Sequence, residues 1–244
     1  MVERRTMPID VAAIRDRLRT NLRRVEARIA AACTRAGRPR DAVTLVAVTK
    51  YVEPHVASLL VELGVHDLGE SRPQELWRKA AAIPQAKWHL VGHLQRNKVE
   101  RTLPVTTMIH SVDSLRLLQA INNEAAKLGR RIPLLFEVNA SGESAKHGFD
   151  PAAFLDASSE FKQTPFVDWQ GLMTMAAETD DPESARPTFR LLRELRDRVR
   201  GFWNDPAALP HLSMGMTGDF EVAIEEGATL VRIGSALFEG IDRS

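Results

Sequence analysis

Eight short apolar runs alternate with helical segments along this chain, and this alternation restricts its fold more than any other feature. A helix between successive strands is typical of repeated strand–helix units and a parallel sheet. Eight such units within 244 residues suit an α/β fold, the (β/α)8 TIM barrel, which occupies this length as one domain. We expect strands at 44–49, 65–69, 87–91, 108–112, 132–138, 169–175, 211–214 and 230–233.

Seven helical segments separate these strands, and several begin with Pro or Asp, which suit a first helical turn. An additional N-terminal helix is expected at 11–37, where apolar residues recur every three or four positions. Its arginines are interspersed with acids, which favours a solvated face over an RNA- or lipid-binding arm. We therefore predict one domain over 1–244, with the barrel at 44–240. The seven segments lie at 54–63, 73–82, 94–101, 114–128, 151–162, 182–203 and 219–226.

A doubly wound open sheet is the main alternative to the barrel. That fold needs a glycine-rich turn after its first strand, whereas residues 49–54 contain no glycine. No low-complexity tract or change of composition divides the chain either. The barrel is therefore the fold that we expect.

The charge balance disfavours several classes of partner. With 33 Lys and Arg against 32 Asp and Glu, the chain has no excess positive charge for nucleic acid or a membrane surface. Its single cysteine, Cys33, can build neither a disulfide framework nor a cysteine metal site. The first residues lack a signal-peptide pattern, and no apolar run approaches membrane-spanning length. We expect a cytoplasmic, monomeric protein without a metal site.

Lys50 ends the first expected strand, at the edge of the sheet where a TIM barrel keeps its chemistry. Partial desolvation at that position would favour a neutral, nucleophilic amine that can form a Schiff base with an aldehyde. The alternative is a lysine that closes the strand and pairs with a nearby carboxylate. Position alone favours this alternative, so the functional hypothesis depends on the end of the chain.

Serines and glycines at the last two strand ends predict a phosphate site. Ser213 and Gly215 belong to the end of the seventh strand, and Gly234 and Ser235 follow the eighth. These two loops of a TIM barrel often hold a phosphate with backbone N–H groups, and serine adds a hydroxyl donor. Each of the four is an ordinary turn residue when taken alone. Their joint position favours the phosphate.

Arg232, on the eighth strand, lies on the same face as Gly234 and can donate to a ring nitrogen without transferring a proton. A salt bridge inside the barrel mouth is the alternative. An amine for an aldehyde, a seat for a phosphate and a donor for a ring nitrogen are the three contacts that pyridoxal 5'-phosphate requires. The sequence therefore predicts that this cofactor binds at the barrel mouth.

Seven motifs follow one another along the chain: 46–50 (VAVTK), 69–75 (GESRPQE), 88–98 (WHLVGHLQRNK), 110–113 (HSVD), 171–175 (GLMTM), 212–216 (LSMGM) and 231–235 (VRIGS). Together they resemble the pyridoxal phosphate homeostasis proteins, known as the YggS or PROSC family. The resemblance implies an alanine-racemase-like barrel, in which Lys50 carries the cofactor as an aldimine and Arg232 faces the pyridine nitrogen. It also implies that the phosphate is surrounded by Ser213, Gly215, Gly234 and Ser235.

Three further residues complete the expected cofactor site. Ser71 stands where the family usually has asparagine, so its contact near the ring is shortened or replaced by water. His93 is expected to line the mouth, and Met173 to contact the cofactor, with a place in the core as the alternative. His89 and His93 have the spacing of a helical zinc pair, but they lie across a strand end without an evident third ligand.

The resemblance implies a carrier that takes part in vitamin B6 and amino acid homeostasis and passes the cofactor to apo forms of pyridoxal phosphate enzymes. An arginine partner opposes protonation of the ring nitrogen and so weakens carbanion chemistry. The alternative is a small amino acid racemase with His93 or another pocket residue as its second base. The only tyrosine, Tyr51, adjoins Lys50 and does not readily reach the opposite face. The polar segment 139–148 is expected to be a mobile loop or lid over this site.

Overall fold

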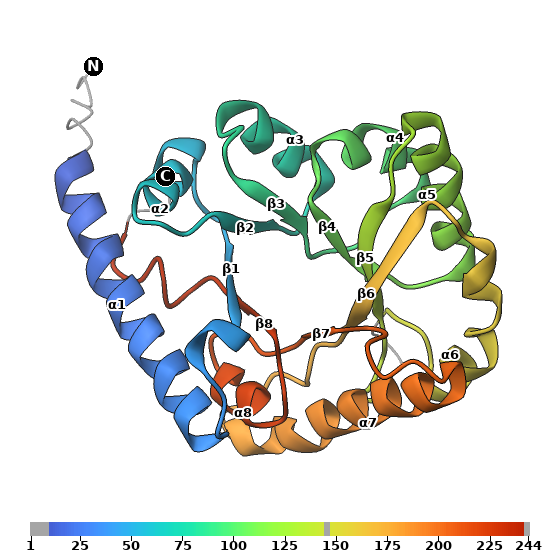
Figure 1. The fold of residues 1–244 in the computed structure, drawn as a ribbon. Helices are drawn as coiled ribbons and strands as arrows, with labels where there is room; N and C mark the ends of the chain where they lie inside the picture. Colours follow the sequence, from blue (N-terminus) through green and yellow to red (C-terminus); the bar gives the residue numbers. More distant parts are fainter. Residues whose placement is uncertain (1–9, 144–146, 242–244) are drawn as a thin grey trace.

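The computed structural model describes residues 10–143 and 147–241, and it confirms the TIM barrel (Figure 1). Eight parallel strands pair in chain order, and the last pairs with the first to close the barrel. Each expected strand bound lies within two residues of the observed one, because the apolar runs are short and sharply bounded. The strands are β1 Thr44–Val48, β2 Asp67–Glu70, β3 Lys87–Leu90, β4 Met108–Val112, β5 Ile132–Glu137, β6 Val167–Met173, β7 His211–Ser213 and β8 Leu230–Ile233.

Helices surround the barrel and connect its strands (Figure 1). The α-helices are α1 Val11–Arg35, α2 Pro54–Glu62, α3 Pro73–Ala82, α4 Val99–Thr102, α5 Leu115–Leu128, α6 Pro151–Ala157, α7 Arg186–Trp203 and α8 Phe220–Glu225. Short 3-10 helices accompany them: η1 Arg40–Ala42, η2 Arg96–Lys98, η3 Leu103–Val105, η4 Glu160–Gln163 and η5 Pro182–Ala185.

The expectation of one continuous helix is wrong for three segments. In 94–101 the only α-helix is the short α4, which lies between the 3-10 helices η2 and η3. In 151–162 the helix α6 ends early, where the Ser158 hydroxyl donates to Leu155 O. In 182–203, α7 begins only at Arg186. Pro187 has no N–H to donate and is therefore tolerated in the first turn of an α-helix but not further inside it.

Alternate strand residues build two separate cores. In β1, Leu45 and Ala47 face outward and join the large cluster packed between the strands and the helices. Residues that face inward form a much smaller cluster, which consists of Val46, Leu135, Met173 and Leu230. Much of the barrel interior is therefore left to polar side chains.

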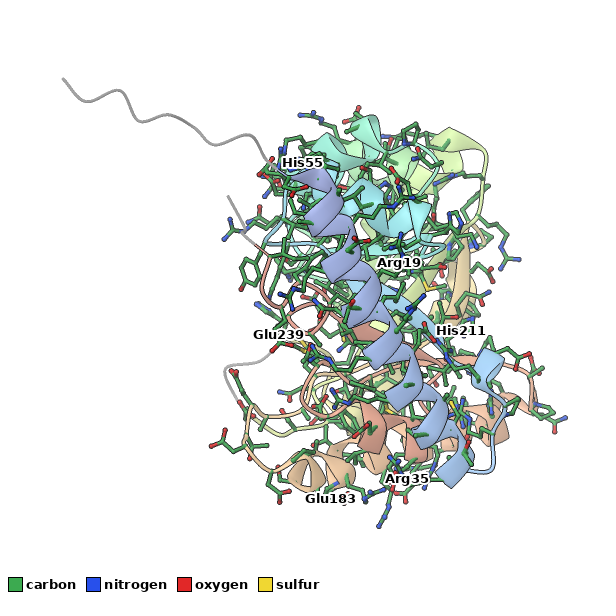
Figure 2. All side chains as sticks on the ribbon, turned by 90° about the vertical axis from the view of Figure 1, so that its left-hand side faces the viewer. Arg19, Arg35, His55, Glu183, His211 and Glu239 are labelled. Atoms are coloured by element: carbon green, nitrogen blue, oxygen red, sulfur yellow. The ribbon has the colours of Figure 1, made fainter. Side chains whose placement is uncertain are left out.

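The N-terminal helix α1 packs along the barrel beside α8 and α2 (Figure 2). Asn21 is buried in this contact, and its Nδ2 donates to Leu237 O and to Glu239 O, each at 2.9 Å. Arg28 and Arg35 remain partly exposed, as expected, but they pair with acids of α8. Such exposed pairs contribute little to stability, so apolar burial holds α1 in place.

Within the described residues, no helix combines the length and the apolar character that crossing a bilayer requires.

Candidate functional site

The amine at the end of the first strand is exposed. β1 ends at Val48, and Lys50 lies in the following turn at the carboxyl end of the barrel. Its Nζ lies 4.8 Å from the ring centroid of Tyr51, and no described carboxylate pairs with it. The expected partial desolvation is therefore wrong, because the turn carries the amine out of the strand into solvent. This exposure leaves the amine accessible to an aldehyde.

A buried ion pair anchors the residue next to Lys50. Lys79 of α3 is 1 % exposed, and its Nζ donates to Thr49 O at 2.7 Å and to Glu70 Oε1. Thr49 Oγ1 donates to the same carboxylate oxygen at 2.7 Å. This pair connects the end of β1 with the end of β2. Removing one partner of such a buried ion pair would lower the stability by about 3 to 5 kcal/mol. We did not expect Lys79 from the sequence, because a lysine on an amphipathic helix normally faces solvent.

Arg232 lies inside the barrel and is 4 % exposed. Its Nη1 donates to Ser213 Oγ at 2.7 Å and its Nη2 donates to Thr174 O at 2.9 Å. Burial lowers the pKa of Arg232 to about 10, against the opposing effect of the Asp219 and Glu137 carboxylates. Arg232 therefore remains a cation at neutral pH, as expected. The alternative salt bridge does not form within the described part of the chain.

The hydroxyl of Ser213 lies beneath Arg232. Ser213 is fully buried and points inward from β7, and its Oγ also lies 2.9 Å from His110 Nδ1. The structure thus places this hydroxyl between Arg232 and His110, and its contact with a phosphate stays a prediction.

The packing of the protein itself requires both expected glycines. Gly215 has a φ of +92°, and a Cβ there would lie 2.6 Å from Ala223 Cβ in α8. A Cβ on Gly234 would lie 3.1 Å from Val48 O, so this glycine lets the loop after β8 approach β1. Their contact with a phosphate stays a prediction.

A hollow of about 620 Å³ opens beside the loops after β7 and β8. Thr217, Ser235 and Ala236 line it together with Arg24 and Arg28 of α1. Within the described residues, the backbone N–H groups of Ser235 and Ala236 have no acceptor. These N–H groups and the two hydroxyls are donors that suit a phosphate, whereas Arg24 pairs with Glu239, which also lines the hollow, and Arg28 pairs with Glu221. Thr217 was missed in the sequence, although its place in the glycine-containing loop could have identified it.

A second hollow, of about 540 Å³, brings Ser71 and His93 together at the ends of β2 and β3. Gly92 permits this arrangement, because a Cβ there would lie 2.2 Å from Ser71 O. Arg72 and Lys98 also line the hollow. The two expected residues therefore share one side of the mouth, and their contact with a cofactor stays a prediction.

A buried carboxylate, Glu137, ends β5 at the barrel mouth. It is 5 % exposed, and its carboxylate accepts no hydrogen bond from any described residue. Burial, followed by the neighbouring charge of Asp113, raises the pKa of Glu137 to about 7, while Arg232 and His147 oppose the shift. Glu137 therefore exchanges a proton near neutral pH. The sequence did not single it out, because it ends an apolar strand whose inward face is not visible without the barrel.

Two histidines, His93 and His147, meet beside the carboxylate of Asp113. His93 Nδ1 lies 3.1 Å from Asp113 Oδ2, and the imidazoles of His93 and His147 stack with their centroids 4.7 Å apart. Ligand atoms of these three residues lie within 4.8 Å of one another, a set that could hold a metal ion. The hydrogen bond and the stacking account for the arrangement without an ion. The expectation of no metal site stays a prediction.

The other two expectations concern Met173 and the segment 139–148. Met173 is fully buried and packs with Val46 in the inner cluster, which favours its role in the core. In the segment 139–148, Asn139 Nδ2 donates to Glu143 O at 2.8 Å. Residues 144–146 lie outside the described part of the chain, so the expected lid stays a prediction.

The fold and the residues at its mouth define an alanine-racemase-like barrel protein. The family model described as alanine racemase, N-terminal domain, matches residues 15–241. The solved alanine racemase of Clostridium difficile 630 gives a TM-score of 0.73 at 19 % identity, covering 91 % of this chain and 56 % of the racemase. That similarity concerns the fold alone.

Relatives closer to this chain in length are also more similar in sequence. The pyridoxal phosphate homeostasis protein of Aquifex aeolicus is 43 % identical over 219 residues, 89 % of this chain and 95 % of the relative. The protein of that name from Homo sapiens is 36 % identical over 242 residues, covering 91 % of this chain and 86 % of the relative. The structure of PipY from Synechococcus elongatus PCC7942 with PLP bound gives a TM-score of 0.75 at 30 % identity, covering 88 % and 99 % of the two chains. The chain described here belongs to the family of pyridoxal phosphate homeostasis proteins.

Proposed function

We propose that this protein binds pyridoxal 5'-phosphate at its barrel mouth and carries the aldehyde on Lys50 as a Schiff base. It acts as a cytoplasmic, monomeric carrier in vitamin B6 and amino acid homeostasis and delivers the cofactor to apo forms of pyridoxal phosphate enzymes. One observation carries the proposal: an exposed amine follows β1, and a buried guanidinium lies on β8, the strand that pairs with β1. In that pairing Val46 lies opposite Arg232, so Lys50 lies beyond the guanidinium toward the mouth.

The residues at the mouth fit the three parts of this cofactor. The Lys50 amine attacks the aldehyde carbon, a C=N bond forms, and the aldehyde oxygen leaves as water. The donors around Thr217 and Ser235 suit the phosphate, and Arg232 can donate to the ring nitrogen. The bound cofactor supplies the aldehyde and, where its ring nitrogen is protonated, an electron sink.

Two features favour a carrier over a catalyst. Arg232 has a pKa of about 10, so at neutral pH it offers a hydrogen bond to the ring nitrogen and keeps its proton. Tyr51 packs against the Lys50 ammonium, on the same side as the reactive amine. It therefore cannot serve as a base from the opposite face.

Absorption spectroscopy with borohydride trapping tests the proposal. The purified protein is expected to take up pyridoxal phosphate with the absorbance of an imine, and peptide mapping after reduction is expected to place the label on Lys50. Lys50→Ala should lose the adduct and remain folded, whereas Lys98→Ala, a change at another lysine near the mouth, should keep it. A wild-type protein that takes up no cofactor supplied in excess would contradict the proposal.

A second candidate function is a small pyridoxal-phosphate-dependent amino acid racemase. Glu137 favours it, because a buried carboxyl group with a pKa of about 7 can accept and return a proton at neutral pH. His93, the base named from the sequence, is more exposed and bonded to Asp113. Single-enantiomer amino acids in deuterated water separate the two functions. Exchange of the α-hydrogen at enzymatic rates, lost in Glu137→Gln, would support the racemase and contradict the carrier.

A further inference from the structure

A chain of hydrogen bonds crosses the interior of the barrel and ends at Arg232. Asp67 Oδ1 lies 3.0 Å from His89 Nε2, and His89 Nδ1 lies 2.9 Å from His110 Nε2. His110 Nδ1 lies 2.9 Å from Ser213 Oγ, which accepts from Arg232 Nη1 at 2.7 Å. The contact between His110 and Ser213 spans the interior, because β4 and β7 are not neighbours in the barrel.

This chain of hydrogen bonds connects the two ends of the barrel. Asp67 is the first residue of β2 and lies at the amino end, as does His211 at the start of β7. Figure 2 shows His211 and Glu239 on opposite sides of α1, which marks the amino end and the carboxyl end of the barrel. His89 and His110 are 3 % and 0 % exposed, so water does not compete for these bonds.

The chemistry of the two end groups gives the chain one direction. A guanidinium only donates hydrogen bonds, and a carboxylate only accepts them. Burial opposes ionisation of Asp67, but the hydrogen bond from His89 and the nearby basic groups His89, Lys87 and His66 together outweigh it, and the pKa of Asp67 is lowered. Burial, followed by the charges of His89, Arg232 and His211, lowers the pKa of His110 well below its ordinary value. In the arrangement in which His110 accepts from Ser213 and donates to His89, each imidazole carries its hydrogen on Nε2, and every bond points from Arg232 toward Asp67.

We propose that His89 and His110 are positioning residues for Arg232, which orient its guanidinium toward the pyridine nitrogen of the bound cofactor. This inference rests on the proposed function. Ser213 has one hydroxyl hydrogen, and the chain directs it to His110, so the oxygen always presents a lone pair to Arg232. The negative charge of the Asp67 carboxylate polarises the hydrogen-bond chain, so that the Ser213 oxygen accepts more strongly from the Arg232 guanidinium.

Nitrogen-15 NMR of histidine-labelled protein without added cofactor tests the chain. His89 and His110 are each expected to carry hydrogen on Nε2 and to accept a hydrogen bond on Nδ1. In Ser213→Ala, the Nδ1 resonance of His110 should shift because it loses its donor. Ser111→Ala is the matched control, because it also removes a buried hydroxyl. That hydroxyl donates to Gly92 O at 2.7 Å and is not part of the hydrogen-bond chain, so the His110 resonance should stay unchanged. Hydrogen on Nδ1 of His110 would overturn the proposal.

Titration with pyridoxal phosphate tests the effect on Arg232. Ser213→Ala is expected to raise the Kd about tenfold and to change the pH profile of the bound cofactor's absorbance, as loss of a charged hydrogen bond predicts. Ser213→Thr, which retains a hydroxyl, should restore both, and Ser111→Ala should match the wild type. Equal binding and equal spectra in Ser213→Ala would overturn this proposal alone, whereas no uptake by the wild type would remove the proposed function as well.

Discussion

The two sides of the barrel mouth differ in how their charged groups are satisfied. On the arginine side, defined as Ser213, Gly215 and Arg232 of β7, β8 and their loops, the cation has two fixed hydrogen-bond acceptors. On the acid side, defined as Asp113 and Glu137 at the ends of β4 and β5, a carboxylate is buried next to another acid. No described residue donates a hydrogen bond to that carboxylate.

This difference separates a side that positions from a side that responds to pH. A cation whose donors are bonded keeps both its orientation and its proton over the physiological range. A buried carboxyl group to which no described residue donates is stabilised in its neutral form, and the pKa of Glu137 is accordingly about 7. Four substitutions test the contrast, and the largest effect is expected on the arginine side.

Gly215→Ala tests the rigidity of the arginine side. The new Cβ would lie 2.6 Å from Ala223 Cβ at a φ of +92°, so clash and backbone strain together should lower the free energy of unfolding by about 4 kcal/mol. Urea denaturation followed by circular dichroism measures this loss. Gly142→Ala is the control, because φ is +74° there and no atom of the described residues lies within 4 Å, and its cost should be about 1 kcal/mol. Equal losses in the two variants would show that α8 can move away.

Glu137→Gln tests the acid side. Because burial raises the pKa of Glu137 from 4.5 to about 7, the folded state holds its proton more tightly than the unfolded state. Its contribution to stability is present below pH about 4.5 and is lost as pH rises to about 7. At about pH 8 the variant should be more stable than the wild type by about 2 to 3 kcal/mol, and near pH 4 the two should be similar. Urea denaturation across this range measures it, and parallel pH profiles would contradict it.

Asp113→Asn tests whether the neighbouring charge contributes to that shift. Removing it should lower the titration midpoint of Glu137 by about one pH unit, while the asparagine oxygen can still accept from His93. Carbon-13 NMR of labelled glutamate follows the midpoint. Asp156→Asn removes an equal charge from the exposed face of α6 and should leave it unchanged. The same midpoint in both variants would leave burial as the sole cause.

His147→Ala should have the smallest effect. The side chain is 66 % exposed and its contact with His93 is a single stacked pair, so its loss should cost less than about 1 kcal/mol. Urea denaturation again measures the change. A larger loss would mean that the acid side is packed as firmly as the arginine side.

Most of the fold could be predicted from the sequence, because parallel strands buried on both faces are continuous apolar runs with polar ends. The strand bounds at 108–112 and 230–233 agree with β4 and β8 at both ends. The prediction of a continuous helix failed where a serine or a proline lies within the helical pattern, as at Ser158 and Pro187. There local backbone chemistry determines the boundary, whereas the hydrophobic period continues through it.

The candidate site could be predicted in part. Lys50 and Arg232 were found because the carboxyl ends of barrel strands meet at one mouth. Ser213 was predicted as a phosphate contact. Its hydrogen bond with His110 was not predicted, because His110 lies 103 residues away. Glu137 and Lys79 were missed, because a charged side chain in a strand or an amphipathic helix carries no local mark of burial.

The sequence by itself determined the strand–helix alternation, the closed parallel barrel and the two basic residues, Lys50 and Arg232, near the carboxyl ends of its first and last strands. These follow from periodicity and strand direction, which are local properties of the chain. Only the tertiary structure decided which polar groups are buried and which partners they have. Burial and pairing depend on strands far apart in sequence that face one another across the interior, and these two quantities set the protonation states at the mouth.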